Sequence, residues 1–240
     1  LMLPCLFISA LRFKILLDGL GMPCAYGRAL TWTMIGVFFN VAMPSATGGD
    51  VVKALYVVSA YPREKRAPAV LSVLLDRMMG LFGLFFLAFM VSLAGGAALE
   101  HRADLDRDAQ DKLLFVVRLV RWMCLGFVLC FWFLTSRRLE RSAWRKRVTL
   151  ALPFGAQIEK LYMGFAGLRE RPALLLVLLG LSNLNHIFLT ASFLALAQGL
   201  HTHFDLLAGL VVIPLLFFAR TFGFAGGFGV GEFASKIVAP

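Results

Sequence analysis

Residues 173–200 read ALLLVLLGLSNLNHIFLTASFLALAQGL, a stretch of 28 residues without a charged side chain. A membrane-spanning helix needs about 20 apolar residues, so this stretch predicts one span. Residues 78–99 are a second uncharged stretch. Residues 113–136 predict a third span, although Arg118 and Arg121 lie in its first half. Together these stretches predict an all-α, polytopic transmembrane helix bundle.

The composition supports this prediction. Of the 240 residues, 60% are hydrophobic and 13% are aromatic, whereas a soluble domain is roughly 45–50% apolar. A soluble fold of this length has too little interior to bury so much apolar surface. The 24 Lys and Arg residues exceed the 14 Asp and Glu residues. We nevertheless expect no nucleic acid partner, because no binding module accompanies the basic residues.

Loop charges predict the orientation of the spans. Residues 136–171 contain nine Lys and Arg, whereas residues 100–112 contain three beside five acidic residues. Because Lys and Arg concentrate in cytoplasmic loops, we expect loop 136–171 to be cytoplasmic and loop 100–112 to be external. We expect a multi-pass protein of the cell inner (plasma) membrane. The basic run at 137–147 is expected to bind anionic lipid headgroups.

Two further segments are interrupted by glycine. Residues 29–61 contain a helical pattern that breaks at MPSATGGD, residues 43–50, and both flanks are basic. A re-entrant helix, which enters from the cytoplasm, breaks and returns, would place both flanks on one side. The segment 206–240 contains a second break and predicts a second re-entrant element. Two such segments indicate a transporter site; the alternative is that Gly–Gly pairs only permit close helix packing.

Three motifs resemble those of one family. Residues 38–54 read FFNVAMPSATGGDVVKA, residues 71–80 read LSVLLDRMMG and residues 226–232 read GGFGVGE. In order and spacing they resemble the lysylphosphatidylglycerol synthase transmembrane region, also called the flippase-like family. The late motif departs from the family pattern, because Gly231 stands where Arg is common.

The resemblance implies lipid handling. We expect a membrane lipid transporter that binds or translocates a phosphate-bearing lipid, either a phospholipid or a polyprenyl-phosphate, between leaflets. The alternatives are a membrane enzyme or enzyme subunit that acts on such a lipid, and an accessory scaffold for a partner synthase. Lysyl-transferring relatives carry a large soluble synthase domain that these residues do not resemble. We therefore do not expect aminoacyl transfer, and the membrane enzyme stays an alternative. Because no catalytic motif and no metal-ligand cluster is visible in the sequence, we expect no catalytic residues, no cofactor and no metal.

The domain organisation follows from the same reading. Residues 1–240 are expected to form a single membrane domain. We expect this domain to be a fragment of a longer chain, because it begins without Met and ends as a new segment starts.

Ionisable residues at membrane depth are costly and therefore indicate function. Arg77 and Arg220 are the favoured phosphate ligands, because a guanidinium group offers two parallel hydrogen bonds. The candidate substrate-binding residues share a position in or beside the three motifs: Gly48, Gly49, Asp50, Lys53, Asp76, Arg77, Arg220, Gly226, Gly227 and Glu232.

Several roles are open for the two carboxylates at the breaks. Asp50 and Glu232 could cap a helix N-terminus, hold an arginine in place, accept an amine-bearing headgroup or titrate in coupled transport. A separate polar group, Asn183, Asn185 and His186, lies in the middle of the 173–200 stretch. Polar side chains at such positions are expected to bond neighbouring helices.

Overall fold

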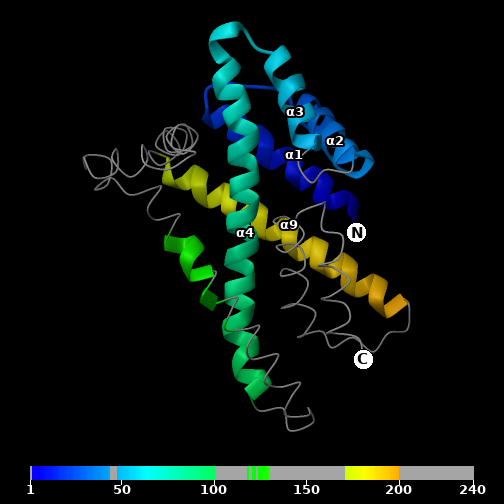
Figure 1. The fold of residues 1–240 in the computed structure, drawn as a ribbon, viewed down its shortest axis with the longest axis vertical. Helices are drawn as coiled ribbons and strands as arrows, with labels where there is room; N and C mark the ends of the chain where they lie inside the picture. The colour runs from blue at the N-terminus through cyan, green and yellow to red at the C-terminus, as the bar shows by residue number, and fades with distance from the viewer. Residues whose placement is uncertain are drawn as a thin grey trace, which may run out of the picture.

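The computed structural model describes residues 2–43, 48–100, 118, 121–122, 124–129 and 171–199. Every regular element in these ranges is helical, which confirms the predicted all-α class. Figure 1 shows their arrangement around the long helix α4. The elements are α1 (Met2–Gly19), α2 (Tyr26–Ala42), α3 (Gly48–Ser59), the 3-10 helix η1 (Arg63–Lys65), α4 (Arg66–Glu100) and α9 (Pro172–Gly199).

Two of the described helices are long and apolar enough to cross a membrane, over Arg63–Met90 and Pro172–Leu196. Helix α9 coincides, to within one residue at each end, with the span predicted at 173–200. Helix α4 differs from the predicted span at 78–99, because it begins at Arg66 and continues through Asp76 and Arg77. These two charged residues lie within the helix because they are paired there, as described below.

Helices α2 and α3 form a hairpin around the predicted break. The chain leaves α2 after Ala42, and α3 begins at Gly48 and packs back against α2. A Cβ at Gly49 would lie 2.0 Å from the carbonyl oxygen of Gly36, so only glycine permits this approach. The Gly49 N–H donates a hydrogen bond to Asn40 Oδ1 over 3.0 Å. Gly49 thus permits close packing of α3 on α2, which was the alternative interpretation of the Gly–Gly pair. Entry of the hairpin into a membrane stays a prediction.

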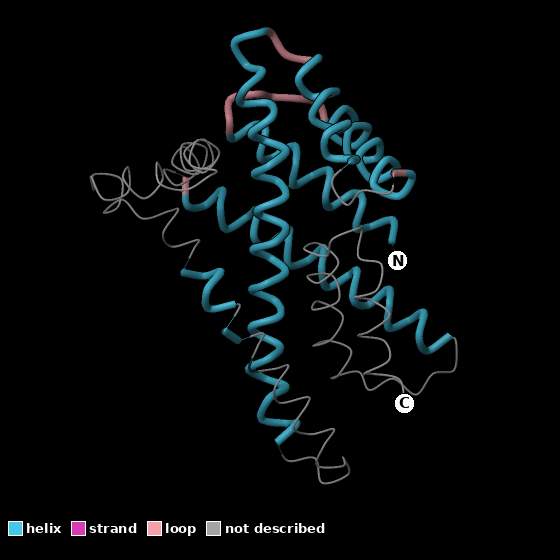
Figure 2. Tube along the Cα trace, in the orientation of Figure 1, coloured by secondary structure: helices cyan, strands magenta, loops and turns pink. Residues whose placement is uncertain are grey.

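The two ends of the hairpin lie side by side. The Tyr61 hydroxyl donates to the Met22 carbonyl oxygen over 3.0 Å, and Lys65 Nζ donates to the Gly21 carbonyl oxygen over 2.8 Å. Figure 2 shows the two loops at the same end of the molecule. The basic flanks of the hairpin therefore share one end.

Apolar packing holds α1 between the hairpin and α9. One buried cluster joins α1, α4 and α9, and another joins α1 to the hairpin and α4. Phe13 belongs to the second cluster and Leu75 to the first, and each is adjacent in sequence to a charged residue, Arg12 or Asp76. The packing that buries these apolar side chains therefore also brings the two charged side chains inside.

Candidate functional site

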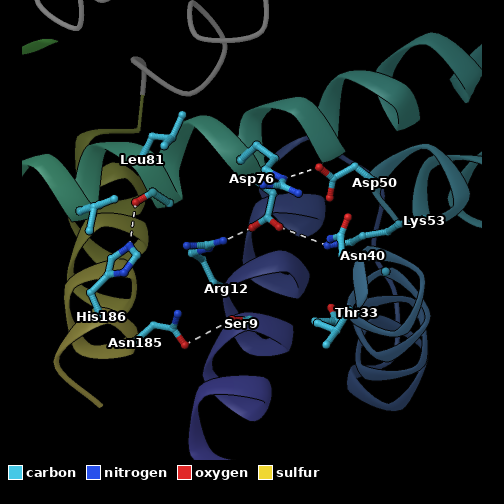
Figure 3. A pocket seen from close by; sticks show the side chains of 15 residues that line it. Ser9, Arg12, Thr33, Asn40, Asp50, Lys53, Asp76, Leu81, Asn185 and His186 are labelled. Carbon is cyan, nitrogen blue, oxygen red and sulfur yellow. Dashed lines mark hydrogen bonds and ion pairs between the residues drawn. The ribbon is translucent and has the colours of Figure 1, made fainter. Parts of the chain in front are cut away.

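A cavity of about 290 Å³ lies among α1, α2, α3, α4 and α9. Figure 3 shows polar side chains from all five helices around it. Five of the lining side chains are charged, namely Arg12, Asp50, Lys53, Asp76 and Arg77. They form two groups that differ in burial.

The first group, which we call the buried cluster, consists of Arg12, Lys53 and Asp76. Arg12 Nε donates to one Asp76 carboxylate oxygen over 2.9 Å, and Lys53 Nζ donates to the other over 3.1 Å. The side chains of Arg12, Asp76 and Lys53 are 10%, 11% and 7% exposed. Asp76 therefore accepts from a cation at both oxygens and is the centre of the cluster (Figure 3).

Two neighbours hold the cations of the buried cluster in place. Arg12 Nη1 donates to Ser182 Oγ of α9 over 2.9 Å. Lys53 Nζ lies 3.6 Å from the centre of the Phe13 ring, a cation–π geometry. Contacts of both kinds compensate for the loss of water around a buried charge.

The second group, which we call the outer pair, is the ion pair between Asp50 and Arg77. The Asp50 side chain is 23% exposed and the Arg77 side chain is 37% exposed. Asp50 lies in the first turn of α3, where a negative side chain is favourable. Pairing with an arginine was one of the roles left open for Asp50, and Asp50 pairs with Arg77 here.

Helix α9 forms the remaining polar wall of the cavity. His186 Nε2 donates to the Gly80 carbonyl oxygen of α4 over 2.9 Å. The Ser9 hydroxyl of α1 donates to Asn185 Oδ1 over 3.3 Å. These two residues bond neighbouring helices, as polar mid-span residues were expected to do, whereas Asn183 donates to Leu179 of its own helix.

The cavity thus brings four predicted site residues together. Asp50, Lys53, Asp76 and Arg77 all line it. Gly48 and Gly49 begin α3 and set its approach to α2. The remaining predictions lie outside the described residues: Arg220, Gly226, Gly227, Glu232, the segment 206–240, residues 101–112 and 136–170 of the two predicted loops with the basic run 137–147, and most of the predicted span 113–136.

Sequence reasoning missed Arg12 as a site residue. Arg12 lies within α1, which continues to Gly19, and it is only 8% exposed. A charged residue several positions before the end of an apolar helix was the available signal. Asn40, which also lines the cavity, lies inside the quoted motif but carried no assigned role.

A metal site is not evident in the part of the chain that the structure describes. No group of three or more His, Cys, Asp or Glu side chains could hold a metal ion there. The chemistry of the cavity is instead that of a mixed set of cations, carboxylates and amides, which suits hydrogen bonding to a polar, charged ligand.

The helices and the cavity define an all-helical membrane protein with a charged interior site. Residues 1–239 match the family described as lysylphosphatidylglycerol synthase TM region, and the chain belongs to this family. Neither a curated protein nor a solved structure gives a significant match.

Proposed function

We propose that the protein binds a phosphate-bearing lipid in this cavity and moves it between the leaflets of the membrane. The observation that carries the proposal is a cavity with five charged side chains, to which two membrane-capable helices contribute. Charged residues at membrane depth typically mark substrate pathways. Family membership supports a lipid as the ligand, since the family name refers to a phospholipid.

The size of the cavity favours a headgroup as the part of the lipid that is bound. A volume of about 290 Å³ is near the lower end of ligand pockets, which span roughly 300–1,000 Å³. Such a volume accommodates a polar headgroup, and the acyl chains would stay in an apolar environment. The headgroup would lie against the polar side chains of Asn40 on α2 and of Asn185 and His186 on α9.

The outer pair supplies an exchangeable phosphate ligand. Arg77 is partly exposed, so a phosphate oxygen can replace the Asp50 carboxylate without exposing a deeply buried charge. Arginine binds phosphate through two parallel hydrogen bonds. The exchange would leave the buried cluster intact.

Lipid translocation by the full protein in proteoliposomes tests the proposal. The liposomes would contain labelled anionic phospholipid, and Arg77→Ala and Asp50→Asn would be compared with the native chain. We expect Arg77→Ala to slow movement roughly tenfold or more, because a hydrogen bond to a charged group contributes about 1.5–3 kcal/mol. Arg63→Ala is the matched control, because Arg63 is exposed and lies outside the cavity.

The same experiment separates the alternatives. A membrane enzyme would return a chemically altered lipid, which mass spectrometry of the recovered lipids would detect. A scaffold would tolerate both cavity substitutions in cells without loss of function. Absence of movement for every lipid, with folded protein and an active control flippase, would overturn the transport proposal.

A further inference from the structure

One ring nitrogen of His186 has no hydrogen-bond partner among the described residues. Nε2 lies 2.9 Å from the Gly80 carbonyl oxygen of α4 (Figure 3), and a carbonyl oxygen only accepts, so Nε2 is assigned the ring hydrogen. A neutral imidazole then has its lone pair at Nδ1. This nitrogen is buried and unpartnered, and His186 lines the cavity. His186 therefore offers the cavity an acceptor that lacks a donor.

We infer that His186 is a proton-binding site, which takes up a proton at Nδ1 when an anionic oxygen of the ligand enters the cavity. This role rests on the proposed function and adds a proton as a second ligand of the same site. The sequence predicted for His186 only a bond to a neighbouring helix, and Nε2 makes that bond. Histidines at membrane depth also mark proton pathways in transporters.

The lone pair at Nδ1 makes the proton a requirement for an anion at this position. An ionised phosphate oxygen has only lone pairs, so it and Nδ1 would face each other as two acceptors without a hydrogen between them. Protonation converts Nδ1 into a donor, and a bond from an imidazolium to a phosphate oxygen is charge-assisted. A proton and an anion beside Nδ1 therefore bind together more readily than either binds alone.

Arg12 of α1 lies beside the His186 ring. Its Nη1 donates over 2.9 Å to Ser182 Oγ, which lies one turn before His186 along α9. A Cβ at Gly80 would lie 3.3 Å from the same nitrogen, so the guanidinium group and the imidazole both lie against Gly80. A like charge nearby disfavours a protonated ring. Arg12 therefore favours a neutral His186 while the cavity holds no anion.

The other charged and titratable groups around the ring do not supply a counter-ion. By helix they are Cys5 of α1, Asp50 and Lys53 of α3, and Asp76 and Arg77 of α4. Each carboxylate is already paired, Asp76 with the two cations of the buried cluster and Asp50 with Arg77. With respect to the described residues, an imidazolium at His186 would thus obtain its counter-ion from the ligand.

Titration calorimetry counts the protons that are taken up on binding. The full protein in an uncharged detergent would be titrated with dioctanoyl phosphatidylglycerol from about pH 5 to about pH 9, which spans the ordinary titration of histidine. Each titration would be repeated in a second buffer with a different ionisation enthalpy, because the difference in heat gives the number of protons exchanged. The phosphodiester itself stays singly ionised over this range. We expect uptake approaching about one proton per lipid, and an affinity that falls by up to about tenfold per pH unit.

His186→Gln is the matched variant for the proton. Its side-chain amide can still donate to the Gly80 carbonyl oxygen, but it does not titrate. We expect this variant to bind the lipid without proton uptake and without the pH dependence. Cys5→Ser is the control, because the Cys5 thiol is another titratable group beside Asn185, and its replacement should leave the proton count unchanged.

Nitrogen NMR keeps the test independent of a variant at His186. The protein would be labelled with 15N-histidine, and the other three histidines, His101, His201 and His203, would be replaced by glutamine. We expect the Nδ1 signal to change from an unprotonated to a protonated nitrogen when the lipid is added. An Nδ1 that stays unprotonated in the complex throughout this pH range would contradict the inference.

The outcomes separate the proton site from the proposed function. Lipid binding without proton uptake at any pH in the range would overturn the proton site and leave lipid binding intact. The same uptake in folded His186→Gln would place the proton elsewhere and would also overturn it. Absence of lipid binding by folded protein at every pH would overturn the proposed function itself. Equally tight, proton-linked binding of deacylated glycerophosphoglycerol would support the proton site and contradict the lipid ligand.

Discussion

The buried cluster and the outer pair both join α3 to α4, but they differ in burial and in charge balance. The side chains of the cluster are at most 11% exposed, whereas those of the outer pair are 23% and 37% exposed. Asp76 accepts from two cations, and Asp50 pairs with one. Two ionic contacts between the same helices therefore have different physical consequences.

Burial determines how strongly each contact is coupled to folding. A charge that loses its partner inside the protein cannot recover its water, whereas a half-exposed charge can. The buried cluster should accordingly fix the shape of the cavity, and the outer pair should be free to exchange partners with a ligand. Three changes test this difference.

The largest effect is expected for Asp76→Asn. This change keeps the shape of the side chain but leaves Arg12 and Lys53 buried without a carboxylate, and breaking such a group costs about 3–5 kcal/mol. Chemical unfolding in detergent, followed by tryptophan fluorescence, would measure the loss of unfolding free energy. The matched change in the outer pair, Asp50→Asn, should cost about 1 kcal/mol or less. Equal losses for the two variants would remove the distinction between the two groups.

An intermediate effect is expected for Gly49→Ala, which disturbs the helix that carries both Asp50 and Lys53. The new methyl group would meet the backbone oxygen of Gly36, and overpacking of this kind costs about 1–3 kcal/mol. The loss would be measured by the same unfolding experiment. Gly27→Ala is the control, because a Cβ at Gly27 has no neighbour within 4 Å. A Gly49→Ala variant as stable as native would contradict the close packing of α2 on α3.

The smallest effect is expected for the coupling between Asp50 and Arg77. A double-mutant cycle of Asp50→Asn and Arg77→Met should give a coupling free energy of about 0.2–1 kcal/mol, typical of exposed pairs. The coupling should fall as salt is added, because ions screen exposed charges. A value of several kcal/mol, unchanged by salt, would place the outer pair in the same class as the buried cluster.

The helical class and part of the site were predictable from the sequence. An uncharged stretch of 28 residues requires no tertiary information to predict a membrane-spanning helix. The motif around Gly48, Gly49 and Asp50 indicated a break in the helix, and the structure has a break there. Asp50, Lys53, Asp76 and Arg77 were selected because an ionisable residue at membrane depth is costly, and all four line the cavity.

The partners of these residues were not predictable from local pattern. Arg12 is 64 positions from Asp76 and 170 from Ser182 in the chain, so only the packing of α1 against α4 and α9 reveals their contact. The same reason explains the start of α4. The predicted apolar span began at residue 78, after Asp76 and Arg77, whereas α4 begins at Arg66 and includes them because other helices supply their counter-charges.

The order of charges along α3 and α4 also fixes how these helices can move. Helix α3 presents Asp50 and then Lys53, and α4 presents Asp76 and then Arg77, so each helix carries one acid and one base. Sliding α3 by one turn in one direction would bring Asp50 toward Asp76, and sliding it in the other would bring Lys53 toward Arg77. Like charges oppose both shifts. Any shear motion in the bundle should therefore keep α3 and α4 together, and α1 should move with them, because its Arg12 is paired with Asp76 of α4.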